Sequence, residues 1–117
     1  MSRGIDIWAA GIVLDKRRND NRIKLMCACP YEGFEKRWNT YEKEEYQNIL
    51  KKADLVKYVC NHYSKTCFQL RNAYMVDLSK RVIAAYNGEK GGTQNTIKYA
   101  KSKNVEVVNI FMYNVEI

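Results

Sequence analysis

The feature that most constrains this chain is a regular alternation of helix-like and strand-like hydrophobic patterns. Helical spacing recurs in residues 5–18, 40–52, 67–78 and 93–103, and short apolar runs fill 23–29, 53–59, 81–86 and 105–111. Strands that alternate with helices form parallel βαβ units, because a parallel pair needs a long crossover. We therefore expect an α/β fold, a Rossmann-like parallel sheet of about four strands with helices on both faces.

Local signals predict where several elements end and which faces they bury. Lys16-Arg17-Arg18 suits the last turn of the first helix, Asn39-Thr40 can cap the second, and Pro30 should close the first strand. The first helix should bury an apolar stripe, which makes Trp8 a core residue rather than a ligand platform. That stripe comprises Ile5, Trp8, Ala9, Ile12 and Val13, and the third helix carries Leu70, Tyr74 and Asp77 at helical spacing.

Chain length and composition predict one domain over residues 1–117. The chain has 117 residues, of which 46% are hydrophobic and 28% charged. No apolar run approaches the roughly 18 residues that span a bilayer. The segment MSRGIDIWAAG also lacks the apolar stretch of a signal peptide. We therefore expect a cytoplasmic protein with no membrane partner.

The charge balance favours a phosphorylated partner. Twenty Lys and Arg against 13 Asp and Glu give a formal net charge of +7. Such a field attracts nucleic acid or small phosphorylated ligands. Basic residues are spread along the chain beside acidic ones, as in 35–37 and 42–45, and only Lys16-Arg17-Arg18 forms a run. Nucleic acid therefore stays an alternative that this distribution does not favour.

The cysteines do not follow a metal-binding pattern. None of the four forms a Cys-x-x-Cys pair, and the chain has a single histidine, His62. Cys60, His62 and Cys67 could supply three ligands, but the segment holds no fourth. Cys27 and Cys29 stand two apart on a strand-like run, where cysteine behaves as a small core residue. We expect reduced thiols, no metal and no cofactor.

Three loops are candidates for a ligand site, because ligands of open parallel sheets bind beyond the carboxyl ends of the strands. They are residues 30–38, 60–66 and 87–96. In the last of these, Gly91-Gly92 lets backbone approach a ligand closely and opens a helix whose N–H groups attract an anion. The hydroxyls of Thr93 and Thr96 could add hydrogen bonds. A plain helix cap after a turn explains the same residues equally well.

Four short motifs follow one another along nearly the whole chain. They are Gly4-Ile5-Asp6-Ile7-Trp8-Ala9, then Pro30-Tyr31-Glu32-Gly33 with Lys36 and Trp38, then Arg71-Asn72-Ala73-Tyr74-Met75-Val76-Asp77, and last Gly91-Gly92-Thr93-Gln94-Asn95-Thr96. Together they resemble the YpsA-like branch of the SLOG superfamily. The resemblance implies a Rossmann-like fold related to the Lonely Guy phosphoribohydrolases and to DNA-processing protein A, with a nucleotide or nucleotide derivative as ligand.

The resemblance also implies which residues contact the ligand. The strongest candidate is Arg71, since a guanidinium near the start of a βα helix suits a phosphate bidentately, although an ion pair with Asp77 or Glu32 is the structural alternative. Asp6 stands close to a helix N-terminus, where it can simply complement the dipole. The full expected set is Arg71, Asn72, Gly91, Gly92, Thr93, Asn95, Thr96, Asp6, Trp8, Pro30 and Glu32.

Two departures from the family pattern bear on function. Relatives usually begin with a strand, a helix and a second strand that ends in a glycine-rich loop, so part of the sheet and of the usual pocket is expected to be absent here. The phosphoribohydrolases also pair an Arg-x-x-x-Met helix with a Glu after the Gly-Gly loop. Arg71 and Met75 match the first element, but residues 93–99 contain no carboxylate. Glycosidic cleavage then lacks an obvious acid or base.

The sequence thus favours a protein that binds a nucleotide without cleaving it, as a sensor or a sequestering protein. Related domains occur in bacterial and phage conflict systems, so a phage-type sponge for an immune signalling nucleotide is a specific version. One alternative is a phosphoribohydrolase-like enzyme with displaced acids such as Glu32 or Glu35. Another is an interaction or inhibitor module with a decayed pocket.

A homo-oligomer, most simply a symmetric dimer, is also expected. Four strands would leave a sheet edge unpaired, and the apolar first helix demands cover. Self-association would supply that cover, and two-fold pairing is the commonest closed form. Alternatively, the first helix folds over the sheet and residues 113–117 cover the edge.

Overall fold

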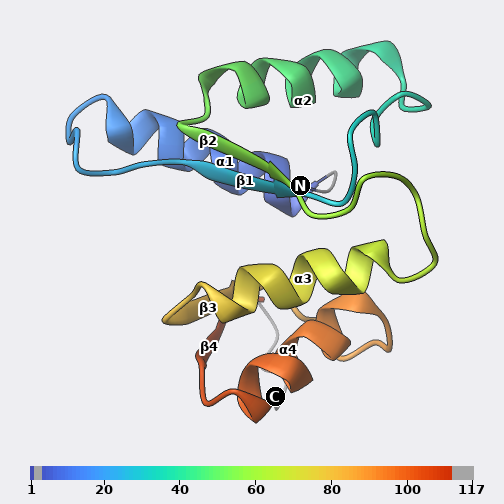
Figure 1. The fold of residues 1–117 in the computed structure, drawn as a ribbon. Helices are drawn as coiled ribbons and strands as arrows, with labels where there is room; N and C mark the ends of the chain where they lie inside the picture. The colour runs from blue at the N-terminus through green and yellow to red at the C-terminus, as the bar shows by residue number, and fades with distance from the viewer. Residues whose placement is uncertain (2–3, 112–117) are drawn as a thin grey trace. The chain divides into compact units, whose positions relative to one another are not determined.

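A computed structural model describes residue 1 and residues 4–111 of the chain, which alternate helix and strand as expected (Figure 1). The chain divides into two compact units, Met1–Ser64 and Lys65–Ile117. The first unit contains α1 (Ile5–Arg17), β1 (Met26–Cys29), α2 (Thr40–Lys52) and β2 (Leu55–Tyr58). The second contains α3 (Cys67–Asp77), β3 (Arg81–Ala84), α4 (Gly92–Ser102) and β4 (Glu106–Asn109). The α/β class predicted from the periodicity is confirmed.

The strands pair in parallel within each unit, but the expected sheet of about four strands is not formed among the described residues. β1 pairs with β2 and β3 with β4, in registers that set Met26 opposite Leu55 and Arg81 opposite Glu106. Each pair consists of two consecutive strands joined by one crossover helix. Among the described residues, β2 and β3, although consecutive, each have their ladder partner inside their own unit. Each strand is also shorter than predicted, with four ladder positions in each pair.

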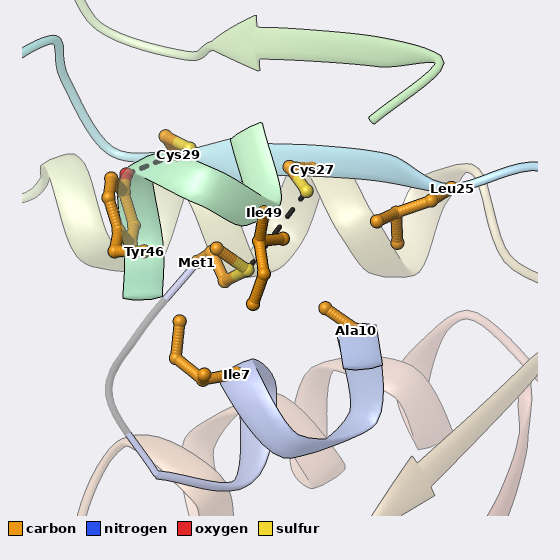
Figure 2. Close-up of a cluster of buried hydrophobic side chains, with 8 residues drawn as sticks. All are labelled: Met1, Ile7, Ala10, Leu25, Cys27, Cys29, Tyr46 and Ile49. Atoms are coloured by element: carbon orange, nitrogen blue, oxygen red, sulfur yellow. Dashed lines mark hydrogen bonds between the residues drawn. The ribbon is translucent and has the colours of Figure 1, made fainter. Parts of the chain in front are cut away.

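The core of the first unit lies between β1 and the two helices α1 and α2 (Figure 2). Leu25, Cys27 and Cys29 alternate along the strand and therefore point to one face. Ile7 and Ala10 of α1 and Tyr46 and Ile49 of α2 pack against that face. Both cysteines thus serve as small core residues, as predicted.

A polar contact lies inside this core. The hydroxyl of Tyr46, which is fully buried, donates to Sγ of Cys29 over 3.1 Å. This bond satisfies a phenol that burial would otherwise leave without a partner. Burial is also the main reason that the pKa of Cys27 rises to about 11. The buried thiol therefore stays protonated at neutral pH.

The prediction of which face of α1 is buried was largely wrong, because of the expected stripe Val13 alone packs against the core. Ile7 and Ala10 are buried, whereas Ile5, Trp8 and Ile12 of the expected stripe are exposed. Residues 5–14 are apolar almost all round the helix, so helical spacing alone does not select a face. Trp8 is consequently not a core residue.

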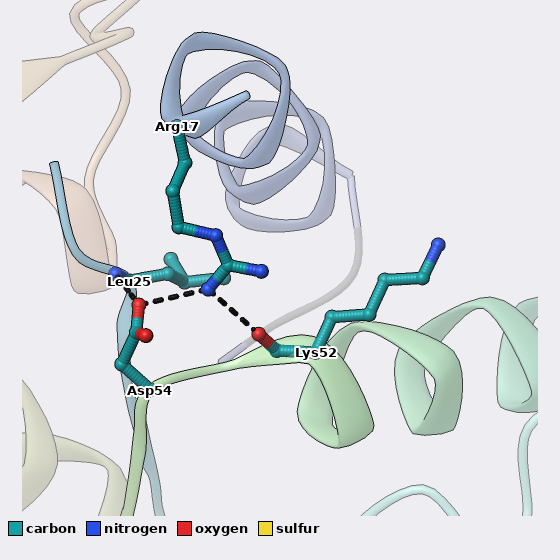
Figure 3. Close-up of polar contacts among 4 residues, drawn as sticks. All are labelled: Arg17, Leu25, Lys52 and Asp54. Atoms are coloured by element: carbon teal, nitrogen blue, oxygen red, sulfur yellow. Dashed lines mark hydrogen bonds and ion pairs between the residues drawn. The ribbon is translucent and has the colours of Figure 1, made fainter. Parts of the chain in front are cut away.

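A cluster of polar contacts joins the C-terminal ends of α1 and α2 to the segment that leads into β1 (Figure 3). Nη1 of Arg17 in α1 donates to the carbonyl of Lys52 at the end of α2 over 2.9 Å and contacts Oδ2 of Asp54 over 2.8 Å. The same carboxylate accepts from the backbone N–H of Leu25 over 2.8 Å. Asp54 thereby links the end of α1, the end of α2 and the approach to β1.

The N-terminus of α2 follows its sequence signal. Asn39 is the N-cap, and its Oδ1 accepts from the backbone N–H of Glu42 over 2.8 Å. Lys51 and Lys52 occupy the last turn, where they complement the helix dipole. The predicted bounds of this helix, Thr40 to Lys52, are confirmed.

The core of the second unit is smaller and consists of Ala84, Tyr86 and Ile97, with Val107 partly buried against them. In α3 the buried residues are Cys67, Arg71 and Val76, while Leu70, which the sequence placed on the helical stripe with Tyr74 and Asp77, is exposed. The stripe was misplaced because α3 buries an arginine, which a hydrophobicity pattern counts as a surface residue.

Ile49→Ala is expected to destabilise the first unit by about 2–5 kcal/mol, because it removes three carbons from a well-packed core. Ile49 is 8% exposed, and Ile83, at 66%, offers the same residue type in solvent as a control. Ile83→Ala should change the free energy of unfolding by no more than about 0.5 kcal/mol. Urea unfolding measures both, and equal effects of the two substitutions would contradict the proposed core.

Asp54→Asn is expected to lower the melting temperature at neutral pH. The backbone N–H of Leu25, and then Arg17, hold the pKa of Asp54 below its usual value. The charged form therefore adds stability above about pH 3.9, the unfolded value, and this contribution disappears as the pH falls through the lower folded pKa.

Melting curves from about pH 7 down to about pH 2 test this. The difference in melting temperature between the wild type and Asp54→Asn should become smaller on acidification. Asp15→Asn is a matched control, because Asp15 is exposed and lies 3.9 Å from Arg18 within the same helix. If this difference in melting temperature widened on acidification, or if Asp15→Asn showed the same pH dependence, the polar contacts of Asp54 would contribute nothing to stability.

Candidate functional site

The candidate ligand residues fall into the two units. Asp6, Trp8, Pro30 and Glu32 belong to the first unit, and the candidates from Arg71 to Thr96 belong to the second. In both units, the loops that follow the strands are at the carboxyl ends of a parallel pair, as predicted. The site is therefore described one unit at a time.

In the first unit, the loops after β1 and β2 meet through aromatic rings. Tyr31, next to the buried Pro30, lies edge-on to Tyr63, with ring centroids 6.0 Å apart. Phe34 and Trp38 continue the same contacts as far as Tyr46 in the core. The ring series anchors the loop after β1 to α2, so that the intervening polar residues stand in a fixed position.

A polar hollow of about 590 Å³ lies beside these rings; we call it the β1–β2 hollow. Glu32 and Glu35 line it, and Oε2 of the buried Glu35 accepts from Nε2 of Gln47 over 3.1 Å. Tyr58 also lines the hollow, and burial is the main reason that the pKa of its hydroxyl is raised. The remaining lining residues are Gly33, Lys36, Leu50, Lys51 and Asn61. The hollow thus places two carboxylates beside two lysines.

Gly33 has a specific role in this hollow. Its φ of +82° is a conformation that side chains rarely adopt. A Cβ at this position would also come within 2.8 Å of Cε of Lys36. Glycine therefore lets the chain turn and lets the Lys36 side chain lie back across it.

Asp6 and Trp8 are not part of this hollow. Asp6 stands in the first turn of α1, where its charge complements the helix dipole. Trp8 instead lines an open groove between α1 and α2. The structure therefore does not bring Trp8 together with Glu32.

In the second unit, the loop after β3 leads into the start of α4. Gly91 is the N-cap, with φ +152° and ψ −162°, a region used almost only by glycine. Gly92, Thr93 and Asn95 are exposed. The hydroxyl of Thr96 donates to the carbonyl of Gly92 over 2.8 Å, so it is engaged within the helix rather than turned to a ligand.

Arg71 and Asn72 stand in the middle of α3. Arg71 is 5% exposed, and its Nε donates to Oδ1 of Asn72 over 2.8 Å. α3 and α4 run in the same direction (Figure 1). The hydroxyl of Tyr99 donates to Asp77 at the end of α3 over 2.7 Å. Arg71 and Asn72 therefore lie between the start of α3 and the contact of Asp77 with Tyr99.

Asn109 is a residue that the sequence reasoning missed. Its Oδ1 accepts from the backbone N–H groups of Tyr86 and Phe111, and its Nδ2 donates to the carbonyl of Tyr86, each over 3.0 Å. The side chain thus fixes the start of the loop that leads to Gly91. A polar residue directly after the apolar run Val107-Val108 was the available signal.

The cysteine side chains, the lengths of the helices and the grouping of possible metal ligands bear on which other sites the described residues could form. All four cysteines are free, and only Cys60 is partly exposed. Over residues 4–111, no helix is long and apolar enough to cross a membrane. In the same described part of the chain, no three His, Cys, Asp or Glu side chains group as metal ligands would.

Comparisons with known proteins agree with the motifs. The model of the YspA SLOG family matches residues 2–116. A UPF0398 protein of Bacillus cereus strain B4264 is 29% identical over 112 residues, which cover 94% of this chain and 61% of the relative. A UPF0398 protein of Staphylococcus aureus strain JH9 is 27% identical over 97 residues, which cover 81% and 52%. The chain therefore spans just over half the length of these relatives.

Proposed function

Because the chain belongs to the YspA SLOG family, a Rossmann-like family, we propose that it binds a small nucleotide or nucleotide derivative without cleaving it. In this proposal the protein acts as a sensor or a sequestering protein. A phage-type sponge for an immune signalling nucleotide is the finer version, and it uses the same site.

The observation that carries the proposal is the open start of α4. The N–H groups of the first helical turn have no partner within the helix, and the dipole favours a negative group there. No described side chain caps this end, and no acidic residue stands in the first turn. A Cβ added to Gly92 would have no heavy atom within 4 Å apart from its chain neighbours and the backbone of its own helix. A phosphate could therefore approach the backbone closely.

Charge around this segment supports an anionic ligand. Lys90 precedes the two glycines, next to an exposed Glu89, and Lys98 follows in the second turn of α4, where it is exposed. These cations add to the positive field of a chain with net charge +7. The absence of a carboxylate from residues 93–99 favours binding over cleavage, because glycosidic cleavage needs a carboxyl group as acid, base or nucleophile.

A second candidate function, nucleotide phosphoribohydrolysis, draws support from the β1–β2 hollow. Glu32 and Glu35 both line it at the carboxyl ends of the strands, where such enzymes hold substrate. In this alternative one of them would replace the missing acid. The fixed position of Glu35 through Gln47 suits a positioned carboxylate.

Gly92→Val is expected to abolish thermal stabilisation by nucleotides while leaving the unliganded melting temperature nearly unchanged. Valine fits the open space in the free protein but blocks a phosphate. A panel of nucleoside mono- and diphosphates and cyclic nucleotides is tested by thermal shift. A ligand at a hundred times its Kd stabilises the wild type by about 2.7 kcal/mol.

Ser102→Val is the control, because it places the same side chain at the opposite end of α4, where it removes only the bond of the Ser102 hydroxyl to the carbonyl of Tyr99. It should keep the nucleotide response. If Gly92→Val responds as strongly as the wild type, α4 does not bind the phosphate. If no nucleotide stabilises the wild type and none is extracted from the purified protein, the chain is better explained as an interaction module.

No free base is expected when the protein is incubated with nucleoside monophosphates. The reason is the missing carboxylate after Gly92, and chromatography of the products measures the outcome. Base release that is lost in Glu32→Gln or Glu35→Gln, yet kept in Glu44→Gln on the exposed face of α2, would establish the enzyme instead.

A further inference from the structure

The β1–β2 hollow contains charged groups of both signs that do not neutralise one another. Glu32 and Glu35 line it together with Lys36 and Lys51. None of these four side chains forms an ion pair with another described residue. The hollow measures about 590 Å³, which is within the usual range of small-molecule pockets. Opposite charges that share a hollow without pairing are available to pair with a ligand.

Glu35 is the most constrained of these groups. It is 8% exposed, and its Oε2 accepts a hydrogen bond from Nε2 of Gln47 over 3.1 Å. The backbone turns at this point, since the N–H of Trp38 donates to the carbonyl of Glu35 over 3.0 Å. A buried carboxylate costs free energy unless a positive group accompanies it, and the amide of Gln47 is neutral. A cation bound in the hollow would supply the missing charge.

Lys36 is held apart from Glu35, although the two residues are adjacent in sequence. Its side chain lies across Gly33, where an added Cβ would come within 2.8 Å of Cε and 3.4 Å of Nζ. Its backbone N–H donates to the carbonyl of Gly33 over 3.0 Å, which closes the same turn. The ammonium group is thus directed back over the turn and forms no ion pair with the neighbouring carboxylate. The hollow therefore presents a fixed carboxylate and a separate ammonium group.

Neutral polar groups accompany these charges. Tyr58 lies at the end of β2, and burial first, then nearby acidic groups, raise the pKa of its hydroxyl, which therefore stays a donor at neutral pH. Asn61 follows Cys60, whose backbone N–H donates to the carbonyl of Pro30 over 2.9 Å. This bond holds the loops after β1 and β2 beside one another. The hollow thus offers hydrogen bonds to a polar ligand without any further charge.

We propose that the β1–β2 hollow binds a small zwitterion of the amino-acid class, with its ammonium group at Glu35 and its carboxylate at Lys36. A phosphorylated ligand would bring its charge beside Glu32 and Glu35, which repel it. A simple cation would bring its charge beside Lys36 and Lys51. A zwitterion matches both signs, and each of its charges forms a charge-assisted hydrogen bond. The proposal does not depend on nucleotide binding at the start of α4, which belongs to the second unit.

Isothermal titration calorimetry of the whole chain with each of the common free amino acids tests the proposal. At least one amino acid should bind with a Kd below about 1 mM. Its N-acetyl derivative lacks the ammonium group, and its amide lacks the carboxylate. Each derivative should bind about tenfold more weakly or worse, because it loses one charged hydrogen bond.

Variants of the two charged residues separate recognition from effects on folding. Glu35→Gln should weaken binding of the free amino acid about tenfold and abolish its advantage over the N-acetyl derivative, since the same contact is removed from the protein side. Lys36→Met should likewise abolish the advantage over the amide. Glu44→Gln and Lys16→Met are the controls, because both residues are exposed in the first unit and lie outside the hollow. They should keep both preferences.

A wild type that binds no amino acid with a Kd below about 1 mM overturns the proposal. A Glu35→Gln variant that keeps the full preference for the free ammonium group does so too. Gly92→Val should bind the amino acid as the wild type does. If nucleotides bind and this variant abolishes their effect, but no amino acid binds, the site at α4 is upheld and the zwitterion site is refuted.

Discussion

Parallel pairing of two four-residue strands is the constraint on which each unit depends. A parallel pair cannot close with a tight turn, so a helix must cross between the strands. That crossover sets both loops that follow the strands at one end of the pair. In the first unit this end gathers Tyr31, Tyr63 and the two carboxylates of the hollow. In the second it gathers the loop to Gly91 and the anchoring side chain of Asn109.

The sequence was most informative where the signal is local. Asn39 as a cap and Pro30 as a strand end act through their own backbone neighbours, so they predict boundaries correctly. The buried face of α1 could not be predicted, because apolar residues surround that helix and only packing on β1 selects Ile7 over Trp8. The contacts of Glu35 with Gln47 and of Asn109 with Tyr86 join residues 12 and 23 positions apart, and no spacing rule predicts them.

The start of α4 and the groove between α1 and α2 differ in their chemistry. The start of α4 offers backbone groups, glycine and surrounding lysines, which suit a compact anion and leave little apolar area. The groove offers tryptophan, isoleucine and charges of both signs. Because the two surfaces use separate elements, substitutions in one should leave the other intact.

The burial of the thiols makes the chain convenient for site-selective chemistry. Cys27, Cys29 and Cys67 are inaccessible, and the raised pKa of Cys27 further suppresses its reactive thiolate. Cys60 is the partly exposed exception among the four, and it stands in the loop directly after β2, one residue before Asn61 of the hollow. A fluorophore attached under native conditions would therefore mark a single position, without any engineered cysteine, and would report on events at the edge of the hollow.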